Sequence, residues 1–127
     1  MEYYKSNGRI VYKSADRYVI YLQLSRYSIT NMHRKNVINR HYAKFRTDEA
    51  KVIKIEDKIN KTCITSIKSD HDKNFIYTVN DVIKIKDYDY DCNKVCGTGI
   101  HFFLTYKAAF HHNIIYKIHD YTGKYKA

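Results

Sequence analysis

Cysteine and histidine side chains lie close together late in the sequence, at a spacing that could hold a metal ion. Cys92 and Cys96 are four residues apart, and His101 follows five residues after Cys96. Zinc prefers thiolate and imidazole ligands. A fourth ligand could come from Cys63, His111 or His112. Structural zinc sites usually carry two close ligand pairs, and here there is one loose pair. We therefore expect no cofactor and two small buried cysteines, with Cys92, Cys96 and His101 as the metal candidates.

His101 could also serve as a general base, because an imidazole changes its charge near neutral pH. It stands between Ile100 and Phe102 in a segment predicted as a strand. Its side chain should therefore face away from theirs, on the same side as Phe103. The sequence places no nucleophile or carboxylate beside it. We interpret it as a histidine packed on the sheet, with one ring nitrogen bonded to the backbone.

Two further motifs fail at identifiable positions. Residues 87–91 (DYDYD) resemble the start of a calcium loop, but Cys92 stands where glycine is required and Thr98 where the last glutamate is required. Gly97 and Gly99 flank Thr98, but neither a GxGxxG pattern nor a Walker lysine accompanies them. We therefore predict a solvated acidic loop, followed by a tight glycine turn into a strand.

The chain carries a formal net charge of +10, and this charge is unevenly distributed. Residues 1–46 contain ten Lys and Arg against two acidic residues, whereas residues 47–127 contain thirteen against eleven. Codon bias could explain the lysines, because Lys, Asn, Ile and Tyr have codons rich in A and T and make up 56 of the 127 residues. It does not explain the arginines, since all six lie in the first segment. This segment is predicted to attract a polyanion or another macromolecule.

Tyrosines alternate with these arginines along the first segment. Arginine binds phosphate bidentately, and tyrosine can stack on bases. The candidate partner-binding residues are Arg17, Arg26, Arg34, Lys35, Arg40 and Arg46. No signature of a known nucleic-acid-binding module accompanies them, so nucleic-acid or ribosome binding stands as an alternative to a protein partner. No hydrolase, metalloprotease or kinase motif is present either.

The length of 127 residues suits a single domain, which we place at 1–127. Hydrophobic residues make up 44% of the chain and aromatic residues 15%, which is enough for a core. No apolar stretch is long enough to span a membrane, and the N-terminus shows no signal peptide. The odd number of cysteines, three, indicates free thiols in a reducing compartment. We expect an intracellular protein without membrane association.

The elements that must position these residues are mostly strands, since apolar residues recur with a period of two. Strands are predicted at residues 8–13, 18–24, 50–56, 63–68, 75–79, 81–86, 99–104 and 113–120. Thr105 is expected to cap a short helix over residues 106–112. Residues 28–46 are predicted to be irregular and exposed, with a helical turn near 31–36, and residues 123–127 to be a frayed tail. The fold class is α+β and mainly β: a small single-domain antiparallel sheet or partly open barrel with one short C-terminal helix.

The segment 50–56 shows this period clearly. Its alternation places Val52 and Lys54 on one face and Ile53 and Ile55 on the other. The pattern predicts a half-buried strand.

Five segments, taken in order, carry a resemblance to a known family. They are residues 8–13 (GRIVYK), 18–24 (YVIYLQL), 44–55 (KFRTDEAKVIKI), 73–79 (KNFIYTV) and 96–105 (CGTGIHFFLT). Together they resemble an uncharacterised domain of giant DNA viruses and some bacteria, often found beside pentapeptide repeats. The resemblance covers about residues 8–112. Its most specific part is the last segment, which is similar to the family pattern C-x-x-G-I-H-F-F.

The chain departs from the family pattern at three places. Phe45 stands where cysteine is usual, Asn80 stands where glycine is usual, and the proline that usually follows the second strand is missing after Leu24. Any metal site shared across the family would be incomplete here because of Phe45. The resemblance implies a fold and a viral setting, in the host cytoplasm, a viral factory or the virion, and it implies no activity.

Two hypotheses of different kinds follow. The first is a non-enzymatic viral interaction domain that presents its basic, Arg- and Tyr-rich face to a macromolecular partner, with no small-molecule substrate. The second is an enzyme with a site around Arg46, His101 and His112, because Arg46 and His101 both lie in family-like segments. Proximity of Arg46 to His101 beside a cleft is the observation that would keep the second hypothesis open.

Overall fold

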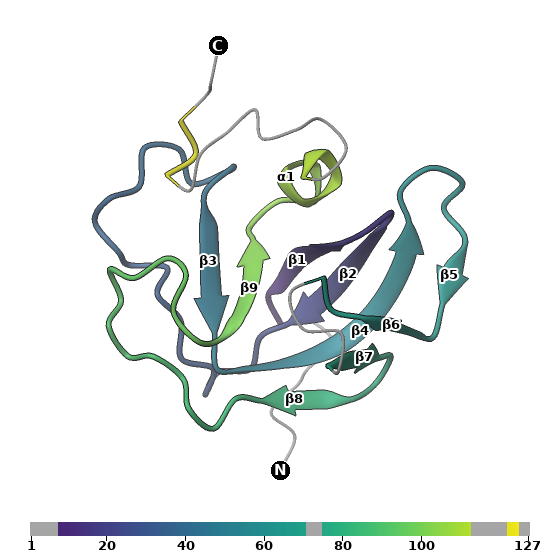
Figure 1. The fold of residues 1–127 in the computed structure, drawn as a ribbon, viewed down its shortest axis with the longest axis horizontal. Coiled ribbons are helices and arrows are strands. Elements are labelled where there is room, and N and C mark those ends of the chain that lie inside the picture. The colour runs from purple at the N-terminus through teal and green to yellow at the C-terminus, as the bar shows by residue number, and fades with distance from the viewer. Residues whose placement is uncertain (1–7, 71–74, 113–121, 125–127) are drawn as a thin grey trace.

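The computed structural model describes residues 8–70, 75–112 and 122–124, and these form nine strands and one short helix (Figure 1). The strands are β1 (Ile10–Ala15), β2 (Tyr18–Gln23), β3 (Lys44–Thr47), β4 (Glu49–Asp57), β5 (Cys63–Ile64), β6 (Ser66–Lys68), β7 (Ile76–Thr78), β8 (Val82–Lys84) and β9 (Ile100–Phe103), and the helix is α1 (Tyr106–His111). The main antiparallel sheet has the order β3-β9-β1-β2-β4-β5, with β8 also paired to β4. Strands β6 and β7 form a separate two-stranded sheet. The predicted mainly-β fold with one short C-terminal helix is confirmed, and the main sheet stays open.

Each face of the main sheet packs against its own apolar cluster. The larger cluster includes Val11 of β1, Leu22 of β2 and Phe102 of β9, all fully buried. The second cluster joins Phe103 to Ala109 of α1, so the helix covers the opposite face. The alternation predicted for β9 is confirmed, because Phe102 and Phe103 belong to different clusters.

Strand β4 contains a bulge that the alternating pattern did not reveal. Tyr21 lies opposite Lys54, but Leu22 lies opposite Val52, so Ile53 is an extra residue in β4. The bulge turns Val52 and Ile55 into the same core and leaves Ile53 37% exposed. The prediction that Val52 and Ile55 lie on opposite faces was therefore wrong.

The prediction that residues 28–46 are irregular and exposed was wrong in part. Strand β3 begins at Lys44, and the Phe45 ring packs 6.2 Å from Phe102 in the core. Asn31 and Arg34 are buried as well, and the turn expected near 31–36 is a single hydrogen-bonded turn, in which the Arg34 amide donates to the Asn31 carbonyl oxygen at 3.0 Å. In the sequence, the basic residues of this segment interrupt the apolar pattern, so the strand that pairs with β9 was not predicted.

One local prediction is confirmed, and one departure from the family pattern has a local explanation. Thr105 caps α1, since its hydroxyl accepts a hydrogen bond of 3.2 Å from the Ala108 amide. Asn80 has a φ of 77°, the left-handed conformation in which glycine is also common. The segment predicted as one strand at 63–68 is divided at Thr65, because β5 and β6 join different sheets.

The predicted last strand, 113–120, lies outside the described residues, as does 125–127 of the predicted tail. Among the helices of the described residues, none has the length and apolar character that a membrane span requires.

Candidate functional site

A cleft of about 760 Å³ is lined by residues from β1, β3, β7, β8 and β9 and by the turn at 96–99. Four lysine side chains line it: Lys13, Lys44, Lys84 and Lys86. Among the acidic residues of the described chain, only Asp87 lines the same cleft. The lining therefore carries an excess of positive charge, which favours an anionic ligand.

Lys13 is the most deeply placed of these lysines. It is 6% exposed, and its ammonium donates a 3.1 Å hydrogen bond to the carbonyl oxygen of His101. Burial chiefly, and nearby Lys44 in addition, lower the pKa of Lys13 to about 8, against the opposing effect of Asp70. Burial also lowers the pKa of Lys44. Because removal from water disfavours both charged amines, an anion bound beside them would restore the stability of their charged forms.

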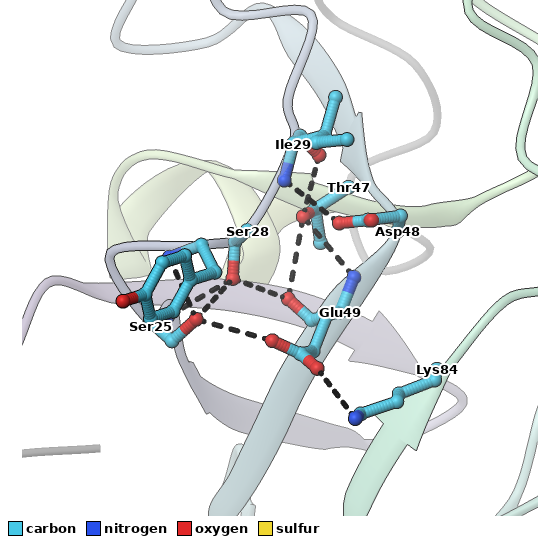
Figure 2. A network of polar contacts seen from close by, with 8 residues as sticks. Ser25, Ser28, Ile29, Thr47, Asp48, Glu49 and Lys84 are labelled. Atoms are coloured by element: carbon cyan, nitrogen blue, oxygen red, sulfur yellow. Dashed lines mark hydrogen bonds and ion pairs between the residues drawn. The ribbon is translucent and has the colours of Figure 1, made fainter. Parts of the chain in front are cut away.

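A polar network holds the β8 wall of the cleft in place (Figure 2). The ammonium of Lys84 lies 3.3 Å from a carboxylate oxygen of Glu49, whose other oxygen accepts a 3.1 Å bond from the Ser25 hydroxyl. The Ser28 hydroxyl donates to the Glu49 carbonyl oxygen at 2.8 Å. Glu49 thus joins the loop after β2 to the lysine edge of the cleft.

The same network fixes the turn between β3 and β4. The amide of Ile29 donates to the Asp48 carboxylate at 2.7 Å, and the Thr47 hydroxyl donates to the Ile29 carbonyl oxygen at 2.8 Å (Figure 2). The Asp48 carbonyl oxygen accepts a 2.8 Å bond from the Ile85 amide, at the end of β8. The turn and β8 are therefore coupled through backbone and side-chain bonds.

Arg46 organises the loop between β8 and β9, which runs beside β3 in Figure 1. Its side chain is fully buried, and its guanidinium donates to four carbonyl oxygens of that loop. The acceptors are Asp89, Asp91, Lys94 and Thr98, with distances of 2.7 Å to Asp91 and 2.9 Å to Lys94. A planar guanidinium can satisfy several acceptors at once, so one side chain sets the path of the loop.

Asn31 reinforces this arrangement from the segment before β3. Its side-chain oxygen Oδ1 accepts a 2.8 Å bond from the Arg46 amide. Its side-chain amide donates to the carbonyl oxygens of Cys92 and Lys94, each at 3.4 Å. The ring of Tyr88 also packs on Arg46, with the guanidinium 4.8 Å from the ring centre.

The structure brings Arg46 and His101 together, because they are directly opposite each other in β3 and β9. His101 lines the cleft and lies with Nε2 3.1 Å from the Val95 carbonyl oxygen, as a histidine bonded to backbone. Arg46 is fully buried and bonded to the loop, so its guanidinium does not face the cleft. The proximity that an enzyme site requires is present, but Arg46 has a structural role.

His112, the third residue of the enzyme hypothesis, lies at the C-cap of α1. Its ring packs 5.5 Å from Phe103. Burial chiefly, together with the nearby charges of Lys44 and Lys58, lowers its pKa to about 4. The imidazole is therefore neutral at pH 7 in the folded protein.

The metal candidates do not converge. Within residues 8–70, 75–112 and 122–124, no three His, Cys, Asp or Glu side chains form a group that could hold a metal ion. Cys92 is half-buried and Cys96 is exposed at the cleft, which corrects the expectation that both are buried. The thiols of Cys63, Cys92 and Cys96 are free.

Two of the candidate partner-binding arginines lie inside the protein. Arg46 is fully buried, and Arg34 is 3% exposed. Arg34 donates to the side chain of Asn36 at 2.7 Å and to the Lys44 carbonyl oxygen at 3.0 Å. These two arginines hold loops together and do not contribute to a basic outer face.

The other candidates are exposed but spread over the surface. Arg17 forms a 2.6 Å ion pair with Asp57 at the β1–β2 turn. Arg26 lies over the Tyr27 ring, and Arg40 donates to the Met32 carbonyl oxygen at 2.7 Å. The last of them is Lys35, which is exposed in the segment before β3.

The four cleft lysines were not singled out in the sequence. For Lys13 a signal exists, because it alternates with Val11 and Ala15 on the face of β1 that forms the core. A lysine at an inward-facing strand position is uncommon unless it has a polar partner or a function. Lys44, Lys84 and Lys86 come together only through the pairing of distant strands.

Substitution of Gly99 by valine is expected to lower the melting temperature by several degrees. A Cβ at Gly99 would lie 2.9 Å from the Tyr88 ring and 3.2 Å from the Thr47 carbonyl oxygen. Overpacking of this kind costs about 1–3 kcal/mol. Circular dichroism melting of the variant tests this expectation, and an unchanged melting temperature would contradict our interpretation of the turn.

Comparison with known proteins identifies one family. Neither the curated proteins nor the solved structures contain a match to the chain. Residues 2–109 match the family described as "Family of unknown function (DUF5758)". The match covers most of the chain, from before β1 into α1. The protein therefore belongs to this family.

Proposed function

We propose that the protein is a non-catalytic binding domain that holds an anionic partner in its lysine-lined cleft. The observation that carries the proposal is the charge of the lining, where four lysines, of which Lys84 is paired with Glu49, stand against Asp87. Lys13 and Lys44 lie there at a cost, because burial disfavours their charged forms. A negatively charged ligand in the cleft would stabilise the charged forms of these two lysines.

Two features favour binding over catalysis. The guanidinium of Arg46 is occupied by the loop carbonyls, and the ring of His101 contacts the Val95 carbonyl oxygen. The proposal places the binding surface in the cleft and not on the arginines of residues 1–46, since Arg34 and Arg46 are buried.

The proposal includes a viral origin and a place inside the host cell, in the cytoplasm, a viral factory or the virion. The abundance of residues with AT-rich codons, 56 of 127, supports the viral origin. The three free cysteines support a reducing compartment.

Replacement of Lys86 by glutamine is expected to weaken polyanion binding about three- to tenfold and to reduce its salt dependence by about one released counterion. Lys86 is exposed, so the substitution should leave the fold intact. Titration calorimetry with inorganic polyphosphate at low and moderate salt measures both effects. Lys107→Gln is the matched control, because Lys107 is exposed on α1 and does not line the cleft.

The wild-type protein is expected to bind polyphosphate most tightly at low salt. Absence of binding at low salt would exclude the proposed function. Equal losses in the Lys86→Gln and Lys107→Gln variants would place the binding surface elsewhere.

A further inference from the structure

Aromatic surface lies beside the positive charge in the cleft. Phe75 and Tyr77 both line it, and their ring centres are 4.9 Å apart. Tyr77 is 4% exposed and belongs to the core, whereas Phe75 is half-buried at its edge. Tyr77 therefore packs beside the Phe75 ring in a tilted pair, and Phe75 offers the more accessible ring.

The charge and the rings are close to each other. The ammonium of Lys13 lies 5.9 Å from the centre of the Tyr77 ring. A ligand that fits both features must carry a negative group next to a flat apolar ring. An acidic peptide or an inorganic polyanion would satisfy the lysines and leave the aromatic surface without a partner.

We propose that the ligand of the cleft is a nucleotide, with its phosphate bound by the lysines and its base stacked on Phe75. This inference rests on the proposed function, which requires only an anion. Lysine is a common phosphate ligand, and base stacking on an aromatic side chain is tolerant of sequence. The volume of about 760 Å³ lies within the range of pockets that enclose small ligands, about 300–1,000 Å³.

The nucleotide could be free or part of a single strand. Lys84 ends β8, and Lys86 follows two residues later, with both side chains exposed along the cleft. Lys86 would contact one phosphate, and Lys84, which keeps its ion pair with Glu49, would contact the next phosphate of a strand or of the same nucleotide. The chemistry of recognition is the same for both sources, so the experiment must separate them.

Fluorescence anisotropy with a labelled ten-nucleotide single strand provides the test, with ATP and inorganic polyphosphate as competitors. We expect the strand to bind, and polyphosphate of equal charge to compete at least fivefold more weakly. Competition by ATP at micromolar concentration would identify the free nucleotide as the source. Competition only at millimolar concentration would identify the strand. Either result supports a nucleotide ligand.

The Phe75→Leu variant removes the ring and keeps an apolar side chain. Loss of one stacked base costs about 1–3 kcal/mol, so the affinity for the strand should fall about five- to hundredfold. The affinity for polyphosphate should not change. Phe75→Tyr should retain tight binding, and its comparison with Phe75→Leu separates stacking from any loss of fold. Phe110→Leu is the control, because Phe110 packs on Tyr106 of α1 and does not line the cleft.

Two outcomes are decisive against the inference. If polyphosphate competes as well as the strand, and Phe75→Leu binds the strand as tightly as the wild type, the nucleotide inference fails and the proposed function stands. If neither polyanion binds at low salt, both fail together.

Discussion

Replacement of Arg46 by methionine is expected to lower the free energy of unfolding by about 3–5 kcal/mol, because hydrogen bonds from a charged donor contribute about 1.5–3 kcal/mol each and several are lost together. The substitution leaves four loop carbonyl oxygens without their donor. It also leaves the Asn31 contact to the Arg46 amide in place, so the effect reports on the guanidinium. Urea unfolding followed by circular dichroism measures the loss.

Hydrogen exchange should show where the loss falls. Amides of residues 88–99 are expected to exchange much faster in the variant, whereas those of β1 and β2 should change only by the global loss of stability. Arg26→Met is the control, because Arg26 is exposed and lies over Tyr27. A loss below about 1 kcal/mol for Arg46→Met would show that the loop holds its path without the arginine.

The second large effect is a rise in stability with pH between about 7 and 9.5. Burial lowers the pKa of Lys13 and of Lys58 from 10.5 to about 8. Between the folded value of about 8 and the unfolded value of 10.5, each lysine binds more protons in the unfolded chain than in the folded protein. The free energy of unfolding therefore increases as the pH increases. The expected rise is about 2 kcal/mol for each lysine.

Lys58 contributes to this pH dependence because it is buried on the side of the sheet that α1 covers. Lys58 is 1% exposed, and its ammonium donates to the Ser14 hydroxyl and the His112 carbonyl oxygen, each at 2.8 Å. Above about pH 10 the trend should reverse, because burial raises the pKa of Tyr77 and the unfolded tyrosines lose protons first.

Urea unfolding at pH 7, 8.5 and 9.5 measures this dependence. The variants Lys13→Met and Lys58→Met should each lose about half of the rise, because each retains one buried lysine. A stability that stays level or falls between pH 7 and 9.5 would contradict the burial of charged lysines.

Elements with local signals were predictable from the sequence. Strand β2 is rich in β-branched and aromatic residues over 18–23, and Thr105 precedes a short helix that it caps. The inward and outward positions of β9 also follow from simple alternation. In each case the information lies within a few residues of the element itself.

The features that were missed depend on contacts between distant segments. Arg46 was interpreted as a surface residue because its four acceptors lie 43 to 52 positions later in the chain. The β4 bulge at Ile53 is set by pairing with β2, which the alternation within β4 does not show. The cleft combines lysines of β1, β3 and the end of β8, so no local pattern indicates it.

The way in which Arg46 holds its loop has a consequence for sequence variation. The guanidinium contacts main-chain oxygens, which every amino acid supplies. Exposed side chains of this loop, such as Asn93 and Thr98, can therefore be exchanged while the backbone keeps its course. Thr98 lines the cleft. The lining of the cleft can thus change one residue at a time along this loop without a change of fold.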